Sequence, residues 1–170
     1  MELIHRVYRY FNGKIRIEEW IQNNKYHRLN RPAIIYYNEN GGKRCERWYQ
    51  NGEFHRLDGP AKIEYYDNGN ISSEEWYQNN QQHRLDGPAI IYYNGDGGKE
   101  SEAWRQRNCL HRLDVPAYID YCYCIKRYFL NDKELTEEQF ERIYVKHISI
   151  ELACWFDDAN LIPIVIGYTH

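Results

Sequence analysis

Paired cysteines, long apolar runs and an excess of positive charge are all missing from this sequence. Its five cysteines are odd in number and include no CxxC pair, so a disulfide framework is not expected. No apolar run approaches the roughly 18 residues of a membrane span, and the opening MELIHRVYRY places charge where a signal peptide needs its apolar segment. Lys and Arg number 22 against 25 Asp and Glu, which disfavours nucleic acid as a partner. We therefore expect a soluble, intracellular protein.

Catalytic and phosphate-binding signatures are absent as well. The strings GxSxG, HExxH and GxxxxGKS/T do not occur, and GGKR and GGKE lack the upstream Gly and the hydroxyl residue of a phosphate loop. Cys122 and Cys124 place two thiols on one side of an expected strand, but a zinc site needs two further ligands that the sequence does not supply. We expect no metal and no cofactor.

What the sequence does contain is a period. Trp recurs at 20, 48, 76 and 104, a motif His at 27, 55, 83 and 111, and Pro at 32, 60, 88 and 116, each with a step of 28 residues. A fixed period of this size indicates a repeat architecture in which each unit stacks on its neighbours. The 17 Tyr residues favour strands as the stacked elements.

Turn signals divide each repeat into two strands. Asn51-Gly52 and Asn68-Gly69 bound one repeat, and Asn79-Asn80 and Asn94-Gly95 bound the next, as in tight turns between antiparallel strands. The first strand contains the Trp (72–78) and the second follows the Pro (61–66). The pattern Ala-x-Ile-x-Tyr predicts that one face of the second strand forms the core; it holds at 33/35/37, 61/63/65, 89/91/93 and 117/119/121.

We predict an all-β, elongated single-layer array of antiparallel hairpins over residues 1–135: a half repeat at 5–19, four full repeats, and a terminal half repeat to 135. Lys126 to Asp132 resembles a Trp strand and its turn, reached four residues early. Thr136 and Gln139 form a capping box, so a helix is expected from Glu137. Residues 136–170, with the apolar LIPIVIGYTH, are expected to cap the array or to form a dimer contact.

The repeated heptapeptide HRLDGPA has two interpretations: a catalytic or metal site, and a structural motif. Equivalent His residues one repeat apart should lie roughly 10 Å from each other, too far to share a metal ion. We therefore interpret the motif as structural. The residues assigned to it in the two central repeats are Trp48, His55, Arg56, Asp58, Gly59, Pro60, Trp76, His83, Arg84, Asp86, Gly87 and Pro88.

Each letter of the motif is given a structural role. Gly59 is expected to adopt a backbone angle that a Cβ forbids, Pro60 to fix φ, and Leu57 to enter the core. Arg56 is expected to reach the Asp of its own or an adjoining repeat. His55 is expected to pack on the Trp ring and donate to a carbonyl, with a pH-switch role as the alternative.

The residue types at the positions between the core residues vary from repeat to repeat. Such variation is typical of a strand face that no single packing requirement constrains. We predict that their apolar and aromatic members form an interaction surface, with ordinary solvent-facing residues as the alternative. The residues are Ile34, Tyr36, Ile90, Tyr92 and Tyr118.

Trp48, Asn51-Gly52, His55, Gly59 and Tyr65 before Asn68-Gly69 together resemble the core of MORN repeats. The form HRLDGPA is similar to MORN-like repeat proteins encoded by giant double-stranded DNA viruses. The resemblance covers about residues 5 to 135, although this repeat is longer and has Arg-Leu-Asp where MORN repeats have Gly directly after the His. It implies a β-hairpin scaffold that binds proteins, often as a dimer, in the cytoplasm of an infected cell or packaged in the virion.

The function we expect is a non-enzymatic scaffold for protein-protein interaction. The partner protein is not identified, and a homodimer is expected through Ile148 to Leu152 and Leu161 to Ile166. Two alternatives stay open: a ligand- or lipid-binding module, and an enzyme using His83, Arg84 and Asp86. Membrane contact is disfavoured because no basic cluster is present.

Overall fold

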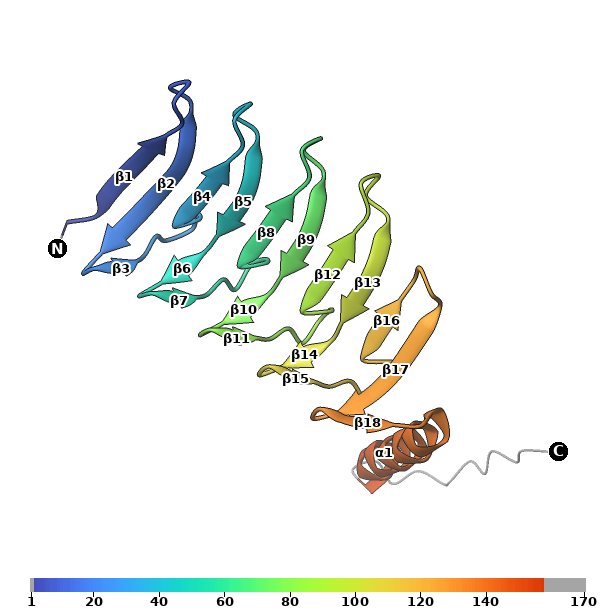
Figure 1. Cartoon of the computed structure of the whole chain (residues 1–170). Coiled ribbons are helices and arrows are strands. Elements are labelled where there is room, and N and C mark those ends of the chain that lie inside the picture. Colours follow the sequence, from blue (N-terminus) through green and yellow to red (C-terminus); the bar gives the residue numbers. More distant parts are fainter. Residues whose placement is uncertain (1, 158–170) are drawn as a thin grey trace.

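The computed structural model describes residues 2–157, and side chains through residue 150. Its strands form one elongated antiparallel sheet, seen as a row of hairpins in Figure 1, which confirms the all-β hairpin array. The sheet runs in the order β1 (Ile4–Arg9), β2 (Ile15–Gln22), β4 (Ile34–Tyr37), β5 (Lys43–Arg47), β8 (Lys62–Tyr65), β9 (Ile71–Glu75), β12 (Ile90–Tyr93), β13 (Lys99–Ala103), β16 (Tyr118–Asp120), β17 (Ile125–Leu130) and β18 (Lys133–Leu135), with β3 (Lys25–Tyr26) paired to β2.

A second row of short hairpins lies along the lower edge of the sheet in Figure 1. These hairpins are β6 (Tyr49–Gln50) with β7 (Glu53–Phe54), β10 (Tyr77–Gln78) with β11 (Gln81–Gln82), and β14 (Arg105–Gln106) with β15 (Cys109–Leu110). The expected Trp strand at 72–78 is therefore two strands, β9 and β10, interrupted at Trp76. The N–H of Trp76 still donates to the carbonyl of Ala89, and its carbonyl accepts from His83, so the break leaves no backbone group unsatisfied there.

The turns of the short hairpins follow the sequence signals. Asn51 and Gly52 both have positive φ, as do Asn79 and Asn80, which is the requirement of a type I′ turn. The upper turn after β12 differs from the expectation, because Gly97 rather than Gly95 has the positive φ. There the Asn94 side chain accepts hydrogen bonds from the N–H groups of Asp96 and Gly98 and shapes a longer loop.

The core draws on both faces of the sheet rather than on one. Ala33, Ala61, Ala89 and Ala117 are fully buried as the Ala-x-Ile-x-Tyr pattern predicts, and Ile35, Ile63 and Ile91 are buried with them. On the opposite face, however, Ile34 and Ile90 are also buried. The one-sided core is therefore an incomplete description. The short hairpins explain the difference, because Arg105 and Leu110 line a groove together with Ile90.

A polar ladder joins neighbouring repeats on the Ala-Ile-Tyr face. The third residue of each pattern donates its hydroxyl to a Glu of the preceding Trp strand: Tyr37 to Glu18 at 2.6 Å, Tyr65 to Glu46 at 2.5 Å and Tyr93 to Glu74 at 2.7 Å. Each Glu lies directly opposite the Ile of the same pattern, for example Glu74 opposite Ile91. Burial and the neighbouring carboxylate raise the pKa of all three tyrosines, so they stay protonated donors.

The C-terminal end of the array matches the sequence prediction. α1 (Glu137–Asp157) begins at the expected residue, and its capping box is formed: Thr136 N–H donates to Gln139 Oε1 at 3.0 Å and Gln139 N–H donates to Thr136 Oγ1 at 3.2 Å. Phe140 is buried against Tyr128 of β17. The predicted tail contact at Leu161 to Ile166 lies outside the described residues.

One strand prediction near this end is wrong. Cys122 and Cys124 lie in the turn between β16 and β17, not on a strand, and both thiols are exposed. Asp120 organises the turn by accepting the N–H groups of Cys122 and Tyr123. No helix within residues 2–157 is both long and apolar enough to cross a membrane.

Candidate functional site

The Arg of the repeated heptapeptide stacks on the Trp of its own repeat. The guanidinium carbon lies 3.7 Å from the Trp ring centroid for Arg28, 4.3 Å for Arg56, 4.1 Å for Arg84 and 3.4 Å for Arg112. A cation over an aromatic ring at this distance is a stabilising contact, and the flat guanidinium covers the indole from water. The motif therefore covers a core aromatic with a charged side chain.

Hydrogen bonds fix the guanidinium in place. Arg56 Nε donates to Asp58 Oδ1 at 2.9 Å and Arg56 Nη1 donates to the Pro60 carbonyl at 3.2 Å, so the pairing lies within the repeat and does not cross to a neighbour. Arg84, Asp86 and Pro88 repeat this geometry. The Arg56 hydrogen bond holds the pKa of Asp58 below its usual value. Asp58 itself projects into solvent.

The prediction that the motif Gly adopts a backbone angle forbidden to other residues is wrong. Neither Gly59 nor Gly87 has positive φ. Instead, a Cβ on Gly59 would lie 2.8 Å from the Arg56 guanidinium carbon, and one on Gly87 would lie 2.5 Å from that of Arg84. The glycine leaves room for the guanidinium. In the fourth copy, where Val115 takes this place, Arg112 bonds Asp114 through two nitrogens, and no bond to the Pro116 carbonyl is found.

The motif His acts as an acceptor between repeats, which corrects the expected packing on Trp. His27 Nδ1 accepts the backbone N–H of Asn51 at 3.1 Å, His55 Nδ1 that of Asn79 at 3.3 Å, and His83 Nδ1 that of Arg107 at 3.2 Å. Each bond reaches the turn of the next short hairpin. In His27 and His83 the acceptor role places the ring proton on Nε2. In His55, Nδ1 also lies 2.9 Å from Asn79 Oδ1, and the direction of that bond depends on the tautomer. For the last copy, His111, the next hairpin is β17–β18, whose Asp132 N–H donates to the Leu110 carbonyl, but the buried Nδ1 of His111 finds no partner among the described residues.

The motif Leu is exposed rather than buried, contrary to the prediction. Leu57 retains 74% of its exposed area, and Leu29 and Leu85 are similarly open. The cause is the Arg-Trp stack, which occupies the space that the Leu was expected to fill. Taken together, the motif His bonds to the next repeat and the motif Arg stabilises its own repeat. The described residues contain no group of three or more His, Cys, Asp or Glu that could hold a metal ion.

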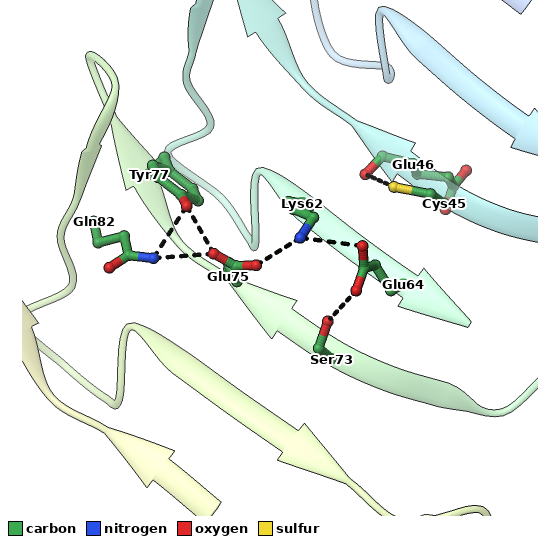
Figure 2. Close-up of polar contacts among 8 residues, drawn as sticks. All are labelled: Cys45, Glu46, Lys62, Glu64, Ser73, Glu75, Tyr77 and Gln82. Atoms are coloured by element: carbon green, nitrogen blue, oxygen red, sulfur yellow. Dashed lines mark hydrogen bonds and ion pairs between the residues drawn. The ribbon is translucent and has the colours of Figure 1, made fainter. Parts of the chain in front are cut away.

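The densest polar cluster lies outside the motif, on the face that carries Ile34, Lys62, Ile90 and Tyr118. Figure 2 shows Lys62 Nζ between Glu75, at 2.8 Å, and Glu64, at 3.1 Å. Glu75 Oε2 also accepts from the Tyr77 hydroxyl and from Gln82 Nε2, and Ser73 Oγ donates to Glu64. β8 and β9 supply the first partners and the short hairpin β10–β11 supplies Tyr77 and Gln82. The period did not reveal this cluster, because the equivalent of Lys62 is Ile or Tyr in the other three full repeats.

The electrostatics of this cluster favour a stable ion pair rather than proton transfer. Burial alone would raise the pKa of Glu75, but hydrogen bonds from Lys62 and Tyr77 outweigh it and hold the pKa below its usual value. Burial opposes the charge of Lys62, yet Glu75 and Glu64 raise its pKa above the usual value. Burial and Glu75 raise the pKa of Tyr77 to about 12. At neutral pH the amine is therefore charged, the carboxylate ionised and the phenol neutral.

A cysteine thiol, that of Cys45, lies beside the cluster, because Cys45 stands directly opposite Glu64 in the sheet. Its thiol is buried and donates to the Glu46 carbonyl at 3.9 Å (Figure 2). Burial raises the pKa of the Cys45 thiol, although Arg47 opposes the rise. A protonated, covered thiol is a poor nucleophile, so we interpret Cys45 as a packing residue.

The predicted interaction surface is divided by the structure. Ile34 and Ile90 are only 2% and 8% exposed, so they support the surface from below, whereas Tyr92 is 46% exposed. Ile90, Tyr92 and Tyr118 come together around a groove of about 510 Å³, which Leu110, Ile125 and Phe129 complete. Tyr36 lies apart, in a groove of about 690 Å³ with Arg47 and Tyr65. In the sheet order, Lys62 and Glu75 fall between the two grooves.

Comparisons with protein families, with curated proteins and with solved structures find no match to this chain.

Proposed function

We propose that the protein is a repeat scaffold that binds another protein through the groove around Tyr92. The observation that carries the proposal is the composition of this groove. Its wall is mainly apolar, and charged side chains also line it; the apolar residues are Ile90, Tyr92, Tyr118, Leu110, Ile125 and Phe129, and the charged ones are Glu102, Arg105, Asp120 and Arg127. An apolar centre with charged edges is the usual anatomy of a protein interface. The resemblance to MORN repeats supports the same function.

The test is capture of partners by wild type and by Tyr92→Asp. Tyr123→Asp is the matched control, because Tyr123 is a more exposed tyrosine in the β16–β17 turn and does not line the groove. A scaffold that uses this groove loses its specific partners with Tyr92→Asp and keeps them with Tyr123→Asp. Equal capture by both variants would reject the groove.

Self-association through the C-terminal segment is the second part of the proposal. Ile143, Val145 and Ile150 remain exposed on α1, so this helix keeps apolar surface uncovered in the single chain. We expect a dimer in light scattering that dissociates with Val145→Asp and Ile150→Asp combined. A monomer at micromolar concentration would end this part of the proposal.

The enzymatic alternative predicts a different effect of replacing His83, Arg84 and Asp86. Under the scaffold proposal, replacing all three by Ala lowers the melting temperature, because His83 accepts the Arg107 N–H of the next short hairpin and Arg84 stacks on Trp76. An active site would instead lose turnover while the protein melts normally. The combined melting and activity measurement separates the two.

A further inference from the structure

The N-terminal edge of the sheet is the strongest further candidate for recognition. β1 is the first strand of the array, and no strand among residues 2–157 pairs with its outer edge (Figure 1). All six of its residues are exposed. A strand edge of this length offers backbone N–H and C=O groups to an incoming strand.

The interior of the array shows what such a strand looks like. By the 28-residue period β1 is equivalent to β4, β8, β12 and β16, each of which pairs on its N-terminal side with a Trp strand. That Trp strand always places a Glu opposite the central Ile: Glu18 opposite Ile35, Glu46 opposite Ile63, Glu74 opposite Ile91 and Glu102 opposite Ile119. Four interior strands therefore each receive a carboxylate at one fixed position.

β1 keeps this receiving position and changes its chemistry. Val7 stands in the place of the Ile, and Arg9 stands in the place of the Tyr whose hydroxyl donates to the Glu. A guanidinium is a stronger donor to a carboxylate than a phenol, because it is charged and can form two parallel bonds. Arg9 donates one of its N–H groups to the Gly13 carbonyl, which leaves others for a ligand.

A second basic residue extends the match. Arg6 stands in the place of Ile34 on the other face of β1 and lies opposite Glu19. No ion pair joins Arg6 to Glu19 within the described residues; Glu19 instead accepts from the Tyr26 hydroxyl. An incoming strand with two successive carboxylates would therefore place one beside Arg9 and Val7 and the next beside Arg6.

We propose that the outer edge of β1 binds an extended acidic segment of a partner protein, which adds to the sheet as an antiparallel strand with Glu-Glu facing Arg6 and Arg9. The inference rests on the scaffold function proposed above and deepens it by naming the chemistry of a partner and a second contact surface.

A second copy of this chain is a poor occupant of the edge. The other open stretch of the sheet is Ile125 to Arg127 of β17, which pairs only with β16 among the described strands. In the register of the array, Lys126 takes the place of Glu102 and Arg127 that of Ala103. A head-to-tail stack would set Lys126 against Arg9 and Arg127 against Arg6, and like charges opposite each other destabilise strand pairing.

The experiment uses the full chain and a labelled peptide with the sequence of residues 70–78, NISSEEWYQ, whose binding is followed by fluorescence anisotropy. We expect saturable binding that weakens by about tenfold or more with the protein variant Arg6→Glu, Arg9→Glu, since several cross-strand charge pairs are reversed. The same loss is expected for the peptide with Glu74→Lys and Glu75→Lys. Combining the reversed peptide with the reversed protein should restore binding.

Controls separate edge addition from other contacts. Lys126→Glu changes the far edge and should leave peptide binding unchanged. N-methylation of alternate peptide amides removes one set of edge donors, so one of the two alternate sets should abolish binding. Circular dichroism establishes that each variant is folded. Absence of binding, or equal affinity of the wild-type and reversed proteins, overturns the inference, whereas loss of partner capture with Tyr92→Asp is measured independently and tests the groove alone.

Discussion

The guanidinium of Arg56 lies 4.3 Å from the centre of the Trp48 ring and donates to the Pro60 carbonyl beneath Gly59. This relationship recurs for Arg84 and Trp76 and accounts for most of the repeated heptapeptide. It makes the heptapeptide a device for covering an indole, and its consequences for stability can be measured.

Gly59→Ala should destabilise the protein by about 1 kcal/mol, because the new Cβ displaces the guanidinium from both the ring and the Pro60 carbonyl. The cost stays moderate since the end of an Arg side chain can move aside. Gly95→Ala is the matched control, because it has open space around its Cβ position and no positive φ. Urea denaturation checks both. Equal stability of Gly59→Ala and wild type would contradict the steric role.

Lys62→Ile should cost roughly 2 to 3 kcal/mol, because it leaves the buried Glu75 carboxylate without its cation. Adding Glu75→Ala should recover most of this loss, since Ile with Ala reproduces the Ile90 and Ala103 pair found one repeat later. Denaturation of the single and double variants gives the comparison. If the double variant is no more stable than Lys62→Ile, the ion pair is not the source of the loss.

Acid should destabilise wild type more than Lys62→Ile. In wild type the pKa of Glu75 is held below its usual value of 4.5, so its stabilising contribution is present above that pH and is lost as the pH falls through the lower folded pKa. In Lys62→Ile, only the hydrogen bonds from Tyr77 and Gln82 still oppose burial, so the pKa of Glu75 should rise and the variant should lose less stability than wild type on acidification. Denaturation midpoints across the acid range test the sign.

Alkali should act through the tyrosines bonded to carboxylates. The pKa of Tyr77 is raised to about 12 from 10.0, so the neutral phenol is favoured in the folded state. The stabilising contribution is complete below pH 10 and declines as the pH rises towards about 12. Phenolate absorbance of the folded protein should therefore lag behind that of the unfolded chain. Tyr77→Phe should reduce the lag, and an unchanged titration would count against the assignment.

His83→Ala should cost about 1 kcal/mol more than His111→Ala, because only His83 accepts a backbone N–H from the next hairpin. The two residues occupy the same place in successive repeats, so they form an internal control. Thermal unfolding of the two variants measures the difference. Equal losses would mean that the bond from Arg107 adds nothing.

Much of the architecture was predictable because the pattern repeats. The step of 28 residues gave the hairpins, the Asn-containing turns and the half repeats, and the capping box placed the start of α1 at Glu137. These features depend on local turn and capping chemistry, which a short stretch of sequence contains. The burial of Ala33 and Ile35 followed from alternation for the same reason.

The errors arose where tertiary packing decides. The sequence shows a Gly at this place in the two central repeats, at Gly59 and Gly87, but not whether a backbone angle or the Arg guanidinium requires it. Leu57 was assigned to the core because it is apolar, whereas Arg56 occupies the indole face in its place. The contact between Lys62 and Glu75 occurs only once, so no recurrence could reveal it.

The side-chain hydrogen bonds between repeats connect residues of adjacent repeats, and this limits what a change in the number of repeats disturbs. Among the described residues, the side-chain hydrogen bonds that join repeats span at most 27 positions, as from Tyr66 to the Tyr93 carbonyl. No bond therefore skips a repeat. Excising or duplicating one whole unit of 28 residues should leave each remaining donor beside an equivalent acceptor, so the array can be lengthened or shortened in evolution without redesign of its ends.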